Sequence, residues 1–312
     1  MKKKNILFRS GIFGLVIGVF ACHKSVTDEL KPQTVPPQTQ HDSTPPVIIK
    51  TDTPTTTATV TAFPQAPVTG CAYDPSYGDS IIYPQPTSGQ DYIINPVNNP
   101  GAGKYLSWPA GMVIDSVTGA IDVTKSQTGE RYAIGFIKKG STDTCLTPLI
   151  IGGADYMDSV YVLSQNATQA VPYFDANPSI GSICSGQGNG GPSCSFDVTG
   201  SAANSKVIVD PQTGVIDLKK TLAGGLLGGA FGLIPVNGQT VSATIYYKLN
   251  DGSNFALQHI VVNIAYYDSK SNMTAGLLDN IVGKLDDALN GHLILLGGNN
   301  PRPPLIVIVR RL

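Results

Sequence analysis

Charged residues, and glutamate above all, are scarce in this 312-residue chain. Only 14% of the residues are charged, and the formal net charge at pH 7 is −1. Glutamate occurs only at Glu29 and Glu130. Because Glu and Lys cover most helical surfaces at little cost in helix propensity, this scarcity argues against a helical body. The near-neutral charge supplies no basic face, so we expect no nucleic-acid partner.

Histidine is equally sparse, which limits the chemistry that the chain can perform. The four histidines are His23, His41, His259 and His292, and none lies in a zinc-binding spacing with cysteine. We therefore expect no metal and no cofactor. A Ser or Cys nucleophile would need a His to activate it, and only His259 and His292 lie in the folded part. We predict that the chain is not an enzyme; a hydrolase that uses His259 is the third alternative.

Only one hydrophobic run stands near the N-terminus, at residues 12–20, and it is too short to cross a bilayer about 30 Å thick. Lysines at 2–4 precede the run, as in a secretory signal. Residues 19–22 (Val-Phe-Ala-Cys) resemble the lipobox of bacterial lipoproteins, although Phe20 is bulkier than usual. The resemblance implies an acylated Cys22, with chains such as palmitate, that tethers the protein to the lipid bilayer of the outer membrane, on its surface or periplasmic face. The alternative is an ordinary secretory signal.

The segment that follows, residues 23–70, is rich in Pro, Thr and Gln. Such a composition buries too little apolar surface to offset the entropy of ordering, and its prolines keep the chain extended. We predict a disordered tether that holds a folded part away from the lipid headgroups.

The remaining four cysteines fit an oxidising compartment. Three pairings are possible. We favour Cys71–Cys145, which would close a first domain end to end, and Cys184–Cys194, which would staple a Gly-rich loop.

Two segments, 112–123 and 207–218, look like copies of each other at a separation of 95 residues. In each, an apolar strand leads to an Asp that would accept hydrogen bonds from a turn, and a Gly takes the position with φ > 0. The equivalent pairs are Asp115 with Asp210 and Gly119 with Gly214. The separation is about one β-sandwich domain of ~100 residues. Calcium on these aspartates is the alternative, but the several carboxylates that it prefers are not clustered here.

The first copy also carries a family resemblance. Residues 108–121 (Trp-Pro-Ala-Gly-Met-Val-Ile-Asp-x-x-Thr-Gly-x-Ile) resemble the hallmark of Ig-like and cadherin-like repeats in bacterial surface proteins, and residues 209–216 keep its later half. The resemblance implies an all-β fold with two tandem Ig-like or cadherin-like β-sandwich domains. After them, apolar residues at helical spacing over 277–289 and two apolar stretches, 292–296 and 305–309, predict a short helix and a terminal β-hairpin. The predicted organisation is a signal peptide with lipobox (1–22), a disordered tether (23–70), a first sandwich (71–165), a second sandwich (166–268), and a C-terminal helix plus hairpin packed on the second sandwich (269–312).

These features favour a non-catalytic function for the lipoprotein at the cell surface: adhesion, scaffolding or ligand binding. The partner would be an unknown protein or glycan, and no ligand-binding residue can be named. An accessory glycan-binding lipoprotein of an outer-membrane uptake system is the alternative. It would draw a sugar platform from a set of tyrosines of which at most half can share one surface, because adjacent residues of a strand point to opposite faces: Tyr156, Tyr161, Tyr173, Tyr246, Tyr247, Tyr266 and Tyr267.

Overall fold

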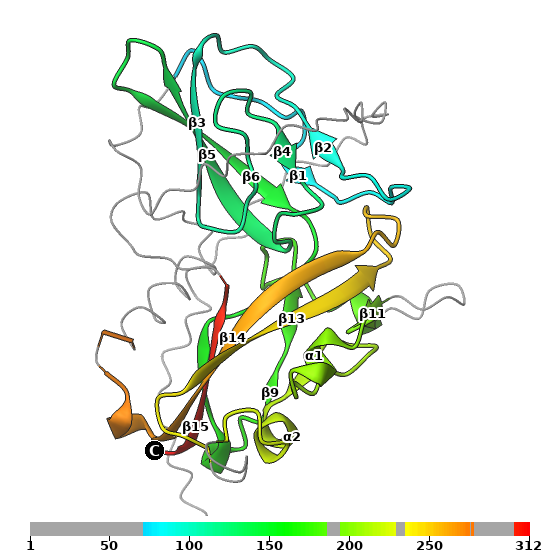
Figure 1. The fold of residues 1–312 in the computed structure, drawn as a ribbon, viewed down its shortest axis with the longest axis vertical. Helices are drawn as coiled ribbons and strands as arrows, with labels where there is room; N and C mark the ends of the chain where they lie inside the picture. Colours follow the sequence, from blue (N-terminus) through cyan, green and yellow to red (C-terminus); the bar gives the residue numbers. More distant parts are fainter. Residues whose placement is uncertain (1–70, 186–193, 229–234, 275, 278–302) are drawn as a thin grey trace, which may run out of the picture. The chain divides into compact units, whose positions relative to one another are not determined.

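The structure is a computed structural model that describes residues 71–185, 194–228, 235–274, 276–277 and 303–312. These residues belong to one compact unit. Strands dominate and the helical pieces are short, so the predicted all-β class is confirmed (Figure 1). No helix within the described ranges has the length and apolar character needed to cross a bilayer.

The first sheet has four strands in the order β1-β6-β5-β3. Its strands are β1 (Ile81–Ile82), β6 (Thr144–Ile151), β5 (Glu130–Lys138) and β3 (Gly103–Trp108). β1 pairs with β6 in parallel, and the other pairs are antiparallel. A separate antiparallel pair joins β2 (Ile93–Ile94) to β4 (Ile121–Asp122).

The pleat of β5 explains how this sheet buries both faces. Tyr132, Ile134 and Phe136 enter the larger hydrophobic cluster. Ala133, one residue out of step, enters a smaller cluster with Leu106 and Trp108. Because successive side chains of a strand point to opposite faces, a run of buried residues here serves two clusters.

The second sheet has five strands in the order β11-β13-β14-β15-β8. They are β11 (Cys194–Phe196), β13 (Thr240–Leu249), β14 (Gln258–Ser269), β15 (Leu305–Arg311) and β8 (Ser159–Val162). Two short pairs accompany it: β7 (Ala154–Tyr156) with β10 (Pro172–Phe174), and β9 (Gln169–Ala170) with β12 (Ile216–Asp217). The helical pieces α1 (Ser201–Asn204) and α2 (Leu218–Ala223) lie in the same part of the chain.

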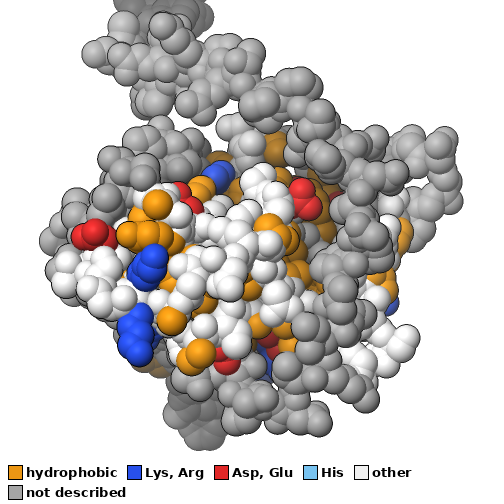
Figure 2. Space-filling view, turned by 90° about the horizontal axis from the view of Figure 1, so that it is seen from above, with side chains coloured by type: hydrophobic (Ala, Val, Ile, Leu, Met, Phe, Trp, Pro, Cys, Tyr) orange, Lys and Arg blue, Asp and Glu red, His pale blue; other side chains and the backbone are white. Residues whose placement is uncertain are grey.

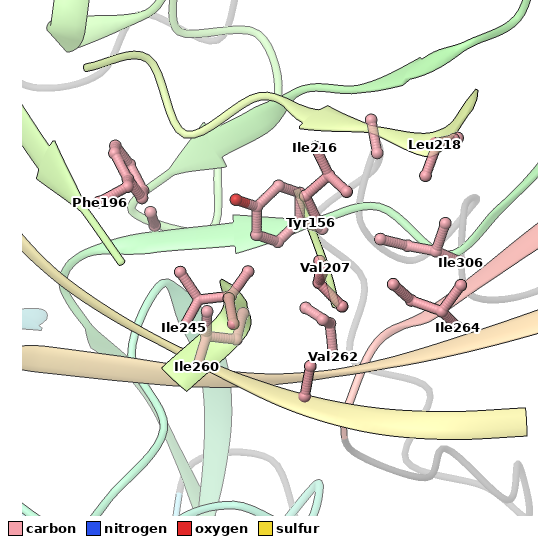
Figure 3. Close-up of a cluster of buried hydrophobic side chains, with 14 of the residues drawn as sticks. Tyr156, Phe196, Val207, Ile216, Leu218, Ile245, Ile260, Val262, Ile264 and Ile306 are labelled. Carbon is pink, nitrogen blue, oxygen red and sulfur yellow. The ribbon is translucent and has the colours of Figure 1, made fainter. Parts of the chain in front are cut away.

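The core of this part lies between the sheet and the short pairs. In Figure 3, Ile245, Ile260 and Ile264 of the sheet lie in one cluster with Tyr156 and Ile216. These five side chains are at most 1% exposed. The cluster therefore joins strands that are far apart in the sequence.

The structure differs from the predicted organisation at one domain boundary and at the predicted terminal hairpin. β8, which the first sandwich (71–165) was predicted to contain, pairs with β15 in the second sheet. β15 in turn has β14 and β8 as parallel neighbours on its two edges, so no edge is open for the hairpin predicted with 292–296. Its unbroken apolar run suits a strand buried on both faces, which alternation alone does not reveal. Residues 292–296, and the predicted helix from residue 278 on, lie outside the described residues.

Candidate functional site

In the first repeat copy, the predicted turn is closed by the carboxylate of Asp115. We call this turn the first corner and its counterpart at Asp210 the second corner. Oδ1 of Asp115 accepts hydrogen bonds from the backbone N–H groups of Val117 and Thr118 at 2.9 and 2.7 Å, and from the Thr118 hydroxyl at 3.0 Å. The N–H of Gly119, at φ 73°, donates to the Asp115 carbonyl oxygen at 2.9 Å. Partial burial raises the pKa of Asp115, but these hydrogen bonds outweigh it, so the pKa is lowered.

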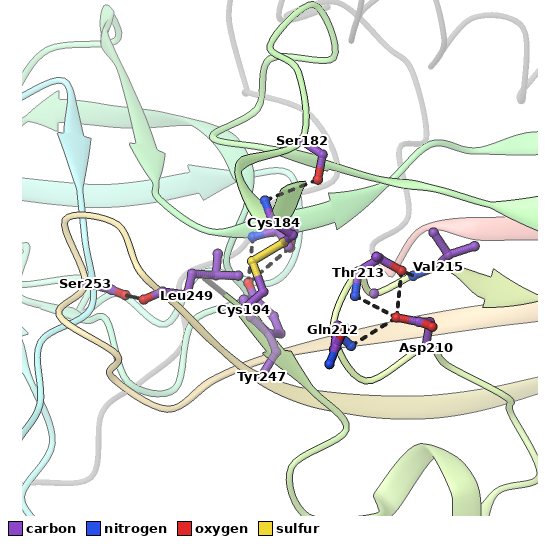
Figure 4. Close-up of a disulfide and its surroundings, with 12 residues drawn as sticks. Ser182, Cys184, Cys194, Asp210, Gln212, Thr213, Val215, Tyr247, Leu249 and Ser253 are labelled. Atoms are coloured by element: carbon purple, nitrogen blue, oxygen red, sulfur yellow. Dashed lines mark hydrogen bonds between the residues drawn. A yellow bond between two sulfur atoms is a disulfide. The ribbon is translucent and has the colours of Figure 1, made fainter. Parts of the chain in front are cut away.

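The second corner repeats these contacts at Asp210 (Figure 4). Its Oδ1 accepts from the N–H of Gln212 at 3.0 Å and from the N–H and hydroxyl of Thr213, both at 2.8 Å. Gly214 has the same φ of 73°. Hydrogen bonds from Thr213 lower the pKa of Asp210. Both carboxylates thus shape backbone, as the sequence predicted.

The equivalence of the two copies extends beyond the sequence motif. The Ser126 hydroxyl accepts from the N–H of Val113, and the Thr221 hydroxyl accepts from the N–H of Ile208, both at 2.9 Å. Each pair is 13 residues apart, and the two pairs are again separated by 95 residues. Ser126 and Thr221 lie beyond the segments 112–123 and 207–218 in which the sequence shows the repeat.

A tyrosine hydroxyl supports each corner from a distant part of the chain. Tyr77 donates to the carbonyl oxygen of Gly119 at 2.6 Å, and Tyr156 donates to that of Gly214. Both tyrosines are buried. No local sequence pattern predicts these bonds, because they span 42 and 58 residues.

The four predicted disulfide cysteines pair as favoured. Cys71 bonds to Cys145 and Cys184 bonds to Cys194, with Cα–Cα distances of 5.6 and 5.2 Å (Figure 4 shows the second). Among the described residues, Cys71, Cys145 and Asp74 form a group close enough to hold a metal ion. Both sulfurs are engaged in the disulfide, so neither offers the thiolate that a metal requires.

His259 lies on β14, where burial lowers the pKa of its imidazole. Its ring lies 5.8 Å, centroid to centroid, from that of Tyr246, the residue opposite on β13. This is the environment of a half-buried strand residue. Cys22, His23, His41 and His292 lie outside the described residues.

The seven tyrosines considered for a sugar platform are buried or half-buried, and none is exposed. Several hydroxyls have structural partners: Tyr173, for example, donates to Oδ2 of the buried Asp155 at 2.9 Å. On the face that Figure 2 shows, charged side chains are few and of mixed sign among hydrophobic and uncharged ones.

A hydrogen bond also joins the two sheets through one buried hydroxyl, that of Tyr247 on β13. It shares this bond with the hydroxyl of Thr128, which precedes β5 of the first sheet, and within the second part it accepts from the N–H of Ala154 on β7 at 2.8 Å. Tyr247 is fully buried and Thr128 is 2% exposed. Water therefore has no access to replace these bonds.

A second set of bonds lies closer to the surface of the same junction. The Tyr83 hydroxyl donates to Oδ2 of Asp175 at 2.8 Å. The side-chain amide of Gln85 donates to the carbonyl oxygen of Gly252 at 2.9 Å and its oxygen accepts from Asn254 at 3.0 Å. These bonds span 92 or more residues, so no local pattern announces them.

Comparison with protein-family models and with curated proteins finds no match to the chain.

Proposed function

We propose that the chain is an exported lipoprotein, anchored through an acylated Cys22 to the outer membrane, that acts without catalysis as an adhesion, scaffold or ligand-binding module. Two tandem Ig-like sandwiches would form its folded part, and residues 23–70 would be the tether. The observation that carries the proposal is that the turn hydrogen bonds engage the two aspartate carboxylates of the repeat. Oδ1 of Asp115 and Oδ1 of Asp210 each close a backbone turn, which supports a structural role for both carboxylates.

The repeat supports the Ig-like assignment. Both copies place the Asp corner beside a short strand pair, β2–β4 in one and β9–β12 in the other. Both build a sheet in which two consecutive long strands are antiparallel. The β-sandwich architecture recurs in many cell-surface domains.

The anchor is tested by replacing Cys22 in whole cells. The Cys22→Ala variant is expected to lose incorporation of a labelled palmitate and to leave the membrane fraction. His23→Ala, one residue further on, is the matched control and should keep both. A labelled, membrane-bound Cys22→Ala variant would contradict the proposal.

The surface function is tested by comparing binding of cells to immobilised proteins and glycans with and without the anchored chain. Loss of binding in cells that carry Cys22→Ala, with normal protein levels, is the expected result. Protease treatment of intact cells tells whether the folded part faces outward. Turnover of an ester or glycoside that is lost in His259→Ala would refute the non-catalytic proposal.

A further inference from the structure

The two sheets have the same strand order except for one strand. In the first, β1 lies directly beside β6 and parallel to it. In the second, β15 separates β8 from β14. The chain's last strand therefore occupies a place that has no counterpart in the first copy.

β8 is the counterpart of β1 by its position in the chain. A buried tyrosine that supports an Asp corner precedes each strand, Tyr77 before β1 and Tyr156 before β8. A short strand that pairs beside the corner follows each, β2 and β9. By the same reasoning β14 corresponds to β6, because each is the second of two consecutive antiparallel strands.

β15 completes the second core from this inserted position. Ile306 and Ile308 enter the main hydrophobic cluster on one face. Val307 and Val309 enter a smaller cluster on the other face, with Ala265 of β14. All four side chains of β15 are fully buried.

The slot, meaning the position between β14 and β8 that β15 occupies, also fixes where β15 starts. The N–H of Leu305 donates to the carboxylate of Asp158, which immediately precedes β8. The carbonyl oxygen of Pro304 accepts from the N–H of Asn263 on β14 at 2.8 Å. The slot therefore recognises this segment in one register.

We propose that β15 is an exchangeable donor strand, which inserts between β14 and β8 of a second copy of this chain and so links copies together. The strand lies outside the repeat, and residues 270–304 connect it to β14. Fully extended, a connection of that length would reach at most ~120 Å. A strand from another copy would make the same contacts as one from the same chain, so exchange loses no contact within the sheet.

Inter-strand cysteines detect the exchange. Ala265 and Val307 are partners in the parallel register of β14 and β15, and their side chains enter the same cluster. One copy carries Ala265→Cys and a differently tagged copy carries Val307→Cys, both full chains with the tag placed between residues 23 and 70, co-expressed in one exporting bacterial cell. The expected result is a species that contains both tags on a non-reducing gel and disappears on reduction.

The matched control uses two strands that belong to the repeat itself. Ser242 and Asn263 are partners on β13 and β14. Divided between two copies as Ser242→Cys and Asn263→Cys, they should give at least several-fold less mixed species than the first pair. Equal yields from the two pairs would overturn the proposal.

The unsubstituted chain gives an independent readout if the substitutions disturb folding. We expect light scattering after gel filtration in detergent to show dimers or longer assemblies. A mass of one chain at every concentration would overturn the proposal. So would a double variant, Ala265→Cys with Val307→Cys, that closes its disulfide only within one chain while the divided pair gives no mixed species.

Discussion

At the scale of single residues, the two Asp corners depend on a glycine for two separate reasons. Gly119 and Gly214 both have φ 73°, a conformation that L side chains rarely adopt. Each also lies against an aromatic ring. A Cβ added at Gly119 would lie 2.5 Å from the ring of Tyr105, and one at Gly214 would lie 2.6 Å from that of Phe196.

Gly140 separates these two reasons experimentally. Its φ is 85°, but a Cβ there would have no atom within 4 Å. We expect Gly140→Ala to cost about 1 kcal/mol in free energy of unfolding, from the backbone alone. Gly119→Ala should cost about 1–3 kcal/mol more, because the ring of Tyr105 must move. Urea denaturation measures both, and equal losses would show that the ring contact has no energetic weight.

The charge of Asp210 gives the second corner a dependence on pH. Its pKa is lowered in the folded state by hydrogen bonds from Thr213, so the ionised form stabilises the fold. This contribution is complete above the unfolded-state pKa of about 4 and is lost as the pH falls through the lower, folded-state value. Asp210→Asn keeps an acceptor oxygen but carries no charge. We expect it to be less stable than the wild type at pH 6, with a smaller gap at pH 3, in urea denaturation.

The exposed Asp79 lies outside both corners and serves as the control for that measurement. Asp79→Asn should follow the wild type at both pH values. A gap between Asp210→Asn and the wild type that stays constant with pH would contradict the role of the charge.

At the scale of elements, the two disulfides close loops of very different length. Cys71 and Cys145 are 74 residues apart, whereas Cys184 and Cys194 are 10 apart. A cross-link restricts the unfolded chain more when it closes a longer loop. We expect replacement of the first pair by Ala to cost about 4–5 kcal/mol and of the second about 3 kcal/mol. Thermal unfolding under non-reducing conditions measures both, and the reverse order would contradict the loop-length argument.

The elements also show which parts of the fold can be predicted from the sequence. The corners at Asp115 and Asp210 were predictable because turn chemistry is local and repeats at a fixed spacing. The place of β15 was not, because its apolar run fits a hairpin as well as a central parallel strand. The candidate site was predictable only in part for the same reason. The sequence identified the corner residues, but it could not identify Tyr77 and Tyr156, which reach the corners only through tertiary contacts.

At the scale of the whole molecule, the question is whether the two sheets unfold together. The described residues form one compact unit, and the hydroxyls of Tyr247 and Thr128 link its two sheets through a buried hydrogen bond. We expect this coupling to make the two sheets unfold in a single cooperative transition. The single tryptophan, Trp108, is 4% exposed on β3 and therefore reports on the first sheet alone.

The substitution Tyr247→Phe tests this coupling, because it acts in the second sheet while Trp108 reports from the first. It leaves the buried N–H of Ala154 without its acceptor, which costs about 1–3 kcal/mol. We expect the fluorescence transition of Trp108 to move to lower urea by the same amount as the circular dichroism transition. Tyr246→Phe, at the half-buried neighbouring position, is the matched control and should move neither. If only the circular dichroism transition moved, the two sheets would be independent domains and the Tyr247 junction a contact without energetic consequence.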